Sequence, residues 1–293
     1  MNSKSKSITD RDRIKIIETP RDGFQSLDEW IPTEVKVAYI NSLLRVGFDT
    51  VEVGSFVSPK YIPQMKDTGE VLSRLDLGES KSKIMVLVGN IRGCQQACEF
   101  PQIDEVIYPY SISPAFLKRN LNATIAEARA TASEMIALCE QHHKELIVYL
   151  TLAFGNPYGD PWSIDLLIEE AEYLRSIGRK CIPLSDTLGT VSPGTLSSVL
   201  PVLTGNFPGI EFGVHLHCRP GEGEEKIKAC WEAGIRRFDS VTGGFGGCPM
   251  ASDEMVSNLD TFELIGYCGK NDIPHNLDLE ALDEAKRFLN SKF

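Results

Sequence analysis

Eight short runs of apolar and β-branched residues recur along the chain, separated by helix-length stretches that each carry an apolar face. Short runs of this kind, between turn residues, are typical of buried strands. Strands that alternate with helices predict βαβ units and a parallel sheet, and eight repeats predict that the sheet closes into a barrel. The expected strands are 13–18, 50–53, 84–89, 104–108, 146–151, 181–185, 211–217 and 237–241.

The pattern predicts an α/β fold, a (β/α)₈ TIM barrel with an extra C-terminal helix. Gly47, Gly178 and Gly234 each follow a helical stretch, where a left-handed C-cap favours glycine. Residues 13–293 are expected to form a single catalytic domain, after a disordered lead-in over 1–12. The expected helices include 33–46, 124–142, 163–176, 224–231 and the C-terminal 277–293.

The composition limits the classes of function. The 293 residues suffice for one barrel, which typically takes about 250. The formal net charge of −11 argues against a nucleic-acid partner, because such proteins need a basic surface. No apolar run reaches the roughly 18 residues of a membrane helix, so no membrane partner is expected. We expect a cytoplasmic protein whose eight cysteines are mostly free thiols.

Cys94 and Cys98 lie four residues apart on an expected helix. A zinc site could use such a pair, but no second pair of Cys or His residues with suitable spacing follows it. The favoured interpretation is two buried cysteines on one helix face.

Reactive side chains follow several expected strands, and the active site of a TIM barrel lies at the carboxyl ends of its strands. Arg21 and Asp22 follow the first strand, and Gly23 is expected to allow a sharp turn there. Arginine suits a carboxylate or enolate oxygen and aspartate suits Mg²⁺ or Mn²⁺, although a surface ion pair is the alternative. Glu52, inside the second strand, is expected to orient Arg21 or a water, because an unpaired buried carboxylate is costly.

His215 and His217 end the seventh expected strand. Side chains two residues apart on a strand point to the same side, so both imidazoles can face one metal ion. Asp22 and Asn258 would add two oxygen ligands to these two nitrogens. Water and substrate oxygens could then complete an octahedral shell around Mg²⁺ or Mn²⁺.

A glycine-rich segment follows the eighth expected strand, with four glycines in positions 243–247 and Cys248 directly after them. Such a segment is typical of a mobile or ligand-covering loop, and a thiol on a closing loop could transfer protons. A phosphate site and a purely structural loop are the alternatives. Asp186, at the end of the sixth strand, offers a further carboxylate.

Taken together, these motifs resemble the 3-hydroxy-3-methylglutaryl-CoA (HMG-CoA) lyase family over about residues 14–268. The resemblance implies a divalent-metal-dependent carbon–carbon lyase that cleaves HMG-CoA to acetyl-CoA and acetoacetate, as in leucine degradation and ketone-body formation. It also implies an acyl-CoA substrate and suggests a homodimer. The matching segments are 20–25, 55–60, 63–65, 113–120, 156–158, 185–189, 215–217, 244–249 and 258–259.

The resemblance also implies a role for each residue. Asp22, His215, His217 and Asn258 would be the metal ligands. Arg21 would stabilise the enolate, Cys248 would transfer protons, and Glu52 and Asp186 would organise the metal site and the substrate. Asp22, a water and Cys248 all stay open as the acceptor of the first proton. The implied substrate-binding residues are Arg21, Gln25, Ser55, Ser113, Asn156 and Thr187, and the candidates for phosphate contact are Lys60, Lys118 and Arg119.

Some positions depart from the family pattern. Pro183 stands in place of a serine, Cys218 in place of an aspartate, Asn156 in place of a frequent cysteine, and Phe262 in place of a glutamate. These positions concern the far end of the substrate, so the resemblance predicts the reaction type more firmly than the substrate. The alternatives are an acetyl-CoA-dependent Claisen-type synthase, a lyase for another branched 3-hydroxyacyl-CoA, and a barrel that binds an acyl-CoA without turnover.

Overall fold

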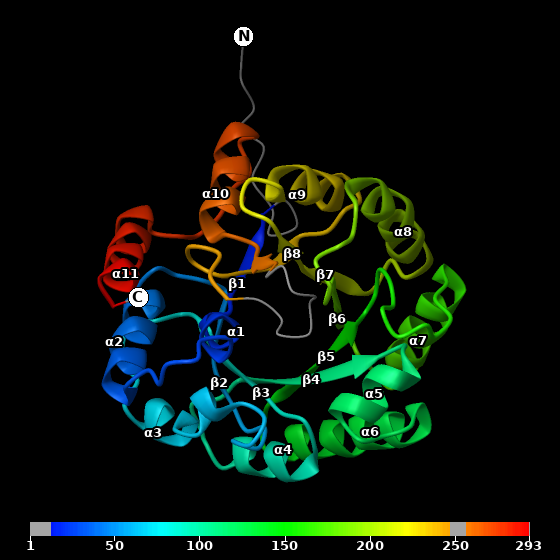
Figure 1. Cartoon of the computed structure of the whole chain (residues 1–293), viewed down its shortest axis with the longest axis horizontal. Helices are drawn as coiled ribbons and strands as arrows, with labels where there is room; N and C mark the ends of the chain where they lie inside the picture. Colours follow the sequence, from blue (N-terminus) through cyan, green and yellow to red (C-terminus); the bar gives the residue numbers. More distant parts are fainter. Residues whose placement is uncertain (1–12, 247–255, 293) are drawn as a thin grey trace.

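The computed structural model describes residues 13–246 and 256–292. Its centre is a closed barrel of eight parallel strands, surrounded by helices (Figure 1). This confirms the predicted (β/α)₈ barrel. In order around the barrel the strands are β1 (Lys15–Glu18), β2 (Thr50–Ser55), β3 (Lys83–Leu87), β4 (Glu105–Ser111), β5 (Glu145–Thr151), β6 (Cys181–Ser185), β7 (Glu211–His215) and β9 (Arg237–Ser240).

Helices return the chain from the carboxyl end of one strand to the amino end of the next, as parallel pairing requires. Ser192 caps one of these helices by accepting a hydrogen bond from the backbone N–H of Thr195. The helices are α1 (Pro20–Gln25), α2 (Thr33–Leu44), α3 (Thr68–Ser73), α4 (Ile91–Cys98), α5 (Pro114–Asn120), α6 (Ile125–Gln141), α7 (Ile164–Ser176), α8 (Pro193–Asn206), α9 (Gly223–Glu232), α10 (Thr261–Lys270) and α11 (Leu279–Lys292), with a 3₁₀ turn, η2 (Pro63–Met65).

Three of the predicted helix ends and the extra C-terminal helix are confirmed. Gly47, Gly178 and Gly234 have φ angles of +87°, +83° and +90°, which is the left-handed conformation expected of a C-cap. Helix α11 packs beside α2 on the outside of the barrel, where the rings of Tyr39 and Phe288 stack 6.2 Å apart (Figure 1). Within the described residues, no helix is both long enough and apolar enough to cross a membrane.

Two apolar layers hold the barrel together. Alternate strand residues point inward, so the lumen is filled by side chains rather than being a pore. The outward-facing residues, such as Ile16 and Val86, pack in the much larger layer between strands and helices. The lumen cluster consists of Ile17, Met85, Ile107, Ile147, Tyr149 and Cys181.

The seventh strand is shorter than the sequence predicts. Strand β7 ends at His215, and His217 begins a separate two-residue strand, β8 (His217–Cys218). Strand β8 pairs in antiparallel fashion with β10 (Ser257–Asn258), in which Asn258 lies opposite His217. Because of this pairing, His217 belongs to a separate two-stranded sheet rather than to the barrel. The pairing also brings the segment around residue 258 to the carboxyl end of β7.

Candidate metal centre and active site

Arg21 and Asp22 lie on the short helix α1, directly after β1. Pro20 takes the first helical position, where its missing N–H costs nothing. Both charged side chains are buried, each with 8% of its surface exposed. The expected sharp turn at Gly23 is wrong, because Gly23 continues the helix. Its lack of a side chain matters for packing instead, since a Cβ there would lie 2.6 Å from the ring of Phe245.

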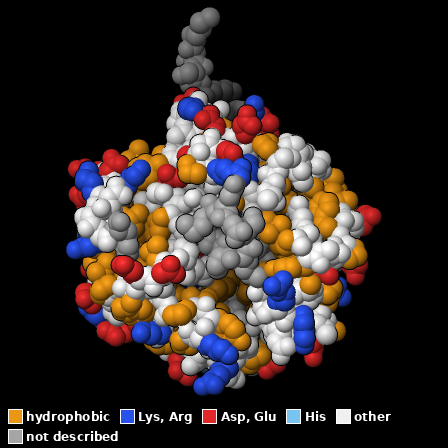
Figure 2. Space-filling model, in the orientation of Figure 1, with side chains coloured by type: hydrophobic (Ala, Val, Ile, Leu, Met, Phe, Trp, Pro, Cys, Tyr) orange, Lys and Arg blue, Asp and Glu red, His pale blue; other side chains and the backbone are white. Residues whose placement is uncertain are grey.

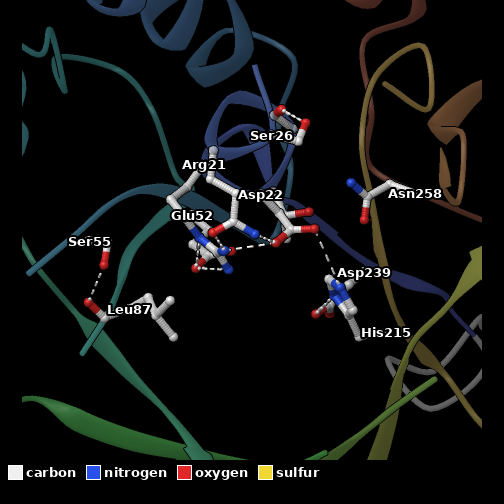
Figure 3. A network of polar contacts seen from close by, with 12 residues as sticks. Arg21, Asp22, Ser26, Glu52, Ser55, Leu87, His215, Asp239 and Asn258 are labelled. Atoms are coloured by element: carbon white, nitrogen blue, oxygen red, sulfur yellow. Dashed lines mark hydrogen bonds and ion pairs between the residues drawn. The ribbon is translucent and has the colours of Figure 1, made fainter. Parts of the chain in front are cut away.

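Arg21 is fixed by three neighbours (Figure 3). Its Nε donates to Glu52 Oε1 at 2.7 Å, as the strand position of Glu52 led us to expect. Its Nη1 donates to Asp22 Oδ1 at 2.7 Å and to Gln25 Oε1 at 2.9 Å. These contacts hold the guanidinium in one orientation beside the cavity, and they leave Asp22 Oδ2 available for another ligand.

The two histidines present the same ring nitrogen to this site. His217 Nδ1 lies 2.9 Å from the carbonyl oxygen of Asp186. A carbonyl oxygen can only accept, so Nδ1 carries the proton and Nε2 keeps its lone pair when the ring is neutral. His215 Nδ1 lies 3.1 Å from Asp239 Oδ2, and a carboxylate favours the same tautomer.

Asp22 Oδ2 and the two Nε2 atoms form a group that can hold a metal ion. Asp22 Oδ2 lies 3.8 Å from Nε2 of both His215 and His217. Donor atoms that bind one ion at about 2.0–2.2 Å lie at most about 4.4 Å apart, so these distances suit a shared ion. Asp22 Oδ2 and His217 Nε2 are buried and form no hydrogen bond within the described residues. Such buried, unpaired donors fit a metal ligand set.

Asn258 lies close to this group. Figure 3 shows its amide pointing toward Asp22 and His215. Its Nδ2 donates to the carbonyl oxygen of Phe245 at 3.2 Å, which leaves Oδ1 as the atom that could bind a metal. Asn258, the fourth ligand expected from the sequence, therefore lies near the other three candidates. The pairing of β8 with β10, in a sheet separate from the barrel, positions it there.

The charges of the site shift several pKa values. Burial alone would raise the pKa of Asp22, but the Arg21 guanidinium and the two histidines lower it. Burial raises the pKa of Glu52 to about 7, although Arg21 opposes this rise. Burial would lower the pKa of His215, but its hydrogen bond to Asp239 and the charge of Asp22 raise it. A proton and a metal ion therefore compete for His215 Nε2.

A cavity of about 410 Å³ opens beside Asp22, His215 and His217 at the carboxyl end of the barrel. Figure 2 shows hydrophobic side chains around a hollow near the centre of this face. The wall away from the metal ligands is apolar and includes Leu87, Ile107, Pro109 and Phe116. The residues predicted for catalysis, metal binding or substrate binding that line this cavity are Arg21, Asp22, Gln25, Glu52, Thr187, His215 and His217.

A larger groove of about 1060 Å³ lies near Asp49 and Lys83. Both residues stand at the amino ends of strands, away from the metal ligands. In the described part of the chain, its lining holds none of the groups that could bind a metal. The smaller cavity is therefore the better candidate for the active site.

Four predicted residues are not among those that line the cavity. Ser55 donates to the carbonyl oxygen of Leu87, and Ser113 caps α5 and contacts the carboxylate of Asp160. Asn156 accepts from the backbone N–H of Tyr158. Asp186 Oδ2 lies 3.3 Å from Lys226 Nζ rather than at the cavity surface. Cys248 lies outside the described residues.

The candidates for phosphate contact differ in position. Arg119 lines the cavity, and its guanidinium carbon lies 4.9 Å from the ring centre of Tyr158. Lys118 is exposed at the end of α5 and donates to Asn122. Lys60 is exposed beside Tyr61, which itself lines the cavity.

Two supporting residues escaped the sequence reasoning. Asp239 holds His215 Nδ1 and also accepts a hydrogen bond from Tyr149 Oη at 2.8 Å. An acidic residue inside the apolar run 237–241 was an available signal for Asp239. Lys226 is 4% exposed and donates to the carbonyl oxygens of His217 and Gly189. No signal pointed to Lys226, because it stands in a charged stretch that resembles a solvated helix face.

Fold and site together define a class of protein: an α/β barrel with a group that can hold a metal ion at the carboxyl ends of its strands. A model of the HMGL-like family matches residues 13–289. The chain therefore belongs to the HMGL-like family.

Individual relatives agree with this assignment. Hydroxymethylglutaryl-CoA lyase YngG of Bacillus subtilis is 32% identical over 273 residues, which cover 93% of this chain and 90% of the relative. The mitochondrial hydroxymethylglutaryl-CoA lyase of Bos taurus is 31% identical, over 94% of this chain and 85% of the relative.

Solved structures give the same result. The Bacillus subtilis HMG-CoA lyase superposes with a TM-score of 0.90 at 31% identity, over 96% of this chain and 94% of that one. The HMG-CoA lyase of Acinetobacter baumannii, solved with coenzyme A and 3-methylmalate, gives 0.88 at 30% identity, over 97% and 92%.

Proposed function

We propose that this protein is a divalent-metal-dependent carbon–carbon lyase that cleaves HMG-CoA to acetyl-CoA and acetoacetate. The observation that carries the proposal is the meeting of Asp22, His215 and His217 beside the fixed guanidinium of Arg21, in one cavity. This arrangement occurs in a chain of the HMGL-like family whose relatives are named for this activity.

The cleavage breaks the bond between the hydroxyl-bearing carbon of the substrate and the α-carbon of its thioester. The hydroxyl proton leaves, the bond electrons form an enolate on the thioester side, and a proton then reaches the enolate carbon. A divalent cation bound by Asp22, His215, His217 and Asn258 would act as a Lewis acid toward the substrate oxygens. Mg²⁺ and Mn²⁺ suit this mixed nitrogen and oxygen ligand set.

Arg21 is proposed to stabilise the negative charge that develops on the thioester oxygen. Its guanidinium lines the cavity and is already oriented by Glu52 and Gln25, so little reorganisation is needed when the thioester oxygen becomes negative. The apolar wall of the cavity lowers the polarity of the surroundings and so strengthens this interaction. We assign the delivery of a proton to the enolate carbon to Cys248, on the basis of the family resemblance.

The remaining assignments rest on the resemblance and on position. Gln25 and Thr187 are proposed to contact the substrate directly, because they line the cavity. Ser55, Ser113 and Asn156 are proposed to bind the substrate, and Asp186 to organise the metal site and the substrate, as the resemblance implies. An acyl-CoA would bring its phosphates toward Arg119. A homodimer and a cytoplasmic location stay predictions.

A different branched 3-hydroxyacyl-CoA is the second candidate substrate. The wall formed by β3, β4 and α5 is apolar, through Leu87, Ile107 and Phe116. An apolar branch would bury surface there, which stabilises binding by about 25 cal/mol per Å².

The test is to strip the protein of metal and measure acetoacetate release from HMG-CoA, with and without Mg²⁺ or Mn²⁺. We expect metal-dependent release, which Arg21→Met should lower by at least about 100-fold. The matched control is Arg45→Met, because Arg45 is exposed on the outer surface and should leave the rate unchanged. Folded protein that binds metal but releases no acetoacetate would contradict the proposed substrate, and the branched analogues would then be assayed.

A further inference from the structure

Three buried cysteine side chains meet outside the barrel, between α4 and α6. Cys94 and Cys98 come from α4 and Cys139 comes from α6. Their exposed fractions are 0%, 7% and 0%. The three Sγ atoms lie within 4.8 Å of one another, and those of Cys94 and Cys139 are 3.6 Å apart.

The fold supplies a ligand that the sequence could not pair with the other two. Cys94 and Cys98 share one face of α4, because residues four apart on a helix are neighbours. Cys139 lies 45 residues after Cys94 and approaches that face from α6. The sequence pattern showed only a pair, whereas the structure shows a triad of sulfur atoms.

The cluster is separate from the candidate active site. Helices of the barrel run from the carboxyl ends of the strands back toward the amino ends. Cys98 is the last residue of α4, and Cys139 lies in the last turn of α6. The cluster therefore lies toward the amino end of the barrel, whereas Asp22 and the two histidines form a distinct group at the other end.

The sulfur positions suit a thiophilic ion. Two sulfurs bound to tetrahedral Zn²⁺ at about 2.3 Å lie about 3.8 Å apart. Cys94 and Cys139 already match this separation. Cys98 would have to move by no more than about 1 Å to match it as well. Sulfur ligands select soft ions such as Zn²⁺ over Mg²⁺ and Mn²⁺.

Nearby positive charge favours the thiolate form of Cys139, one of the three thiols of the cluster. Lys144 Nζ donates to the carbonyl oxygens of Phe100 and Ile103 at 2.7 Å each, which holds its ammonium beside the cluster. The pKa of Cys139 is lowered by its hydrogen bond with Cys94 and by the charges of Lys144 and Arg179. The same hydrogen bond and burial raise the pKa of Cys94, and burial raises the pKa of Cys98 to about 11, so a bound ion must displace the protons of these two thiols. Zn²⁺ with three thiolates carries one negative charge, which the Lys144 ammonium would balance.

We propose that Cys94, Cys98 and Cys139 form a binding site for one thiophilic divalent cation of the zinc class. Binding replaces three S–H bonds by three sulfur–metal bonds and releases three protons to solvent, with no change of oxidation state. No fourth Cys, His, Asp or Glu joins the cluster within the described residues. The fourth position of the ion is therefore left to an oxygen of water or of the backbone.

The first experiment uses the unmodified, fully reduced protein, with Mn²⁺ in large excess to occupy the mixed nitrogen and oxygen site of Asp22, His215 and His217. One equivalent of Zn²⁺ is added, and X-ray absorption at the zinc edge measures the ligand shell. We expect a shell dominated by three sulfurs at about 2.3 Å. A shell of nitrogen and oxygen, or one with a single sulfur, would overturn the proposal. This measurement needs no variant that might fail to fold.

The second experiment uses variants and Co²⁺, whose bonds to thiolate sulfur give intense near-ultraviolet absorption. We expect this absorption in the parent protein and in Cys268→Ser, which removes a buried cysteine of α10 outside the cluster. Cys139→Ser should weaken Co²⁺ binding by more than the roughly 10- to 100-fold caused by loss of an outer-shell partner. Equal affinity in the parent and in folded Cys139→Ser would reject the site.

Discussion

At the residue scale, the tautomer of His215 depends on a single carboxylate. Asp239 Oδ2 accepts from His215 Nδ1 at 3.1 Å and from Tyr149 Oη at 2.8 Å. The phenol fixes the carboxylate, and the carboxylate fixes the imidazole, so that Nε2 faces Asp22. Asp239 is a positioning residue, because it contacts the imidazole of His215 and would act on a metal ion only through that ring.

We predict that Asp239→Asn lowers the affinity for Mn²⁺ by about 10- to 100-fold, the usual cost of losing an outer-shell partner. The amide can rotate its NH₂ group toward Nδ1, which would favour the tautomer with Nε2 protonated. Electron paramagnetic resonance of free Mn²⁺ measures the affinity. Asp283→Asn, on the exposed surface of α11, is the control. An unchanged affinity in folded Asp239→Asn would contradict the positioning role.

The candidate metal ligands are easier to predict from the sequence than the residues that support them. Asp22, His215 and His217 stand out because unusual residue types follow apolar runs. The contacts of Lys226 with Asp186 and with the backbone of His217 join segments that are far apart in the chain. Only the folded barrel brings them together, so a charged helical stretch gives no indication that its lysine is buried.

At the scale of elements, the glycine-rich segment after β9 packs directly on α1. A Cβ at Gly246 would lie 2.6 Å from the Cα of Gly23, and Gly246 has a φ angle of +77°. Gly23 in turn has no room for a Cβ beside the ring of Phe245. Close backbone contact therefore couples this segment to the helix that carries Arg21 and Asp22.

We predict that Gly246→Ala lowers the free energy of unfolding by about 1–3 kcal/mol, because alanine is strained at a positive φ and would push α1 away. The shift of Arg21 should lower kcat by up to about 100-fold. Chemical denaturation and the acetoacetate assay measure the two effects. Gly266→Ala is the control, because a Cβ inside α10 at that position meets open space and should stabilise the helix by about 0.5–1 kcal/mol. A Gly246→Ala protein that matches the parent in both assays would contradict the coupling.

The break between β7 and β8 shows where local patterns fail. The alternating residues of 211–217 predict one strand, and β7 does follow that pattern as far as His215. The pairing of His217 with Asn258 depends on a segment about forty residues further on, which no local window contains. The same pairing places Asn258 near Asp22 and His215, so the sequence singled out Asn258 as a candidate ligand but did not predict the strand that positions it.

At the scale of the whole molecule, the barrel was predictable because the alternation of apolar runs and amphipathic stretches is repeated eight times. The contacts that close the barrel between β1 and β9, here called the seam, were harder to predict from the sequence. Glu18, at the carboxyl end of β1, accepts hydrogen bonds from the backbone N–H of Thr242 at 2.7 Å and from Thr261 Oγ1 at 2.8 Å. These contacts tie the first strand to the last part of the barrel across more than 220 residues.

This buried carboxyl group should make stability depend on pH. Burial raises the pKa of Glu18 from 4.5 to about 7, although the hydrogen bonds from Thr242 and Thr261 oppose the rise. Between these two values the folded chain holds a proton that the unfolded chain has released. The contribution of Glu18 to stability is therefore fully present below about pH 4.5 and is lost as the pH rises through about 7.

We predict that Glu18→Gln removes this dependence. The amide is neutral and nearly isosteric: its oxygen can accept from Thr242 N–H while its NH₂ group donates to Thr261 Oγ1. The Thr261 hydroxyl can then donate to Ser240 Oγ, which is 2.9 Å away. Relative to the parent, the variant should gain stability as the pH rises from about 4.5 to 7, by at most about 1.4 kcal/mol per pH unit.

Urea denaturation at a series of pH values, in the absence of metal, isolates the contribution of Glu18. The quantity to follow is the difference in unfolding free energy between Glu18→Gln and the parent, because other carboxyl groups titrate equally in both proteins. Glu134→Gln, on the exposed face of α6, should give a difference that stays flat with pH. A flat difference for Glu18→Gln as well would mean that Glu18 is ionised in the folded barrel. The seam would then be held by a charged group, and Glu18 would contribute a pH dependence only below about pH 4.5, where a lowered pKa would make stability fall on acidification.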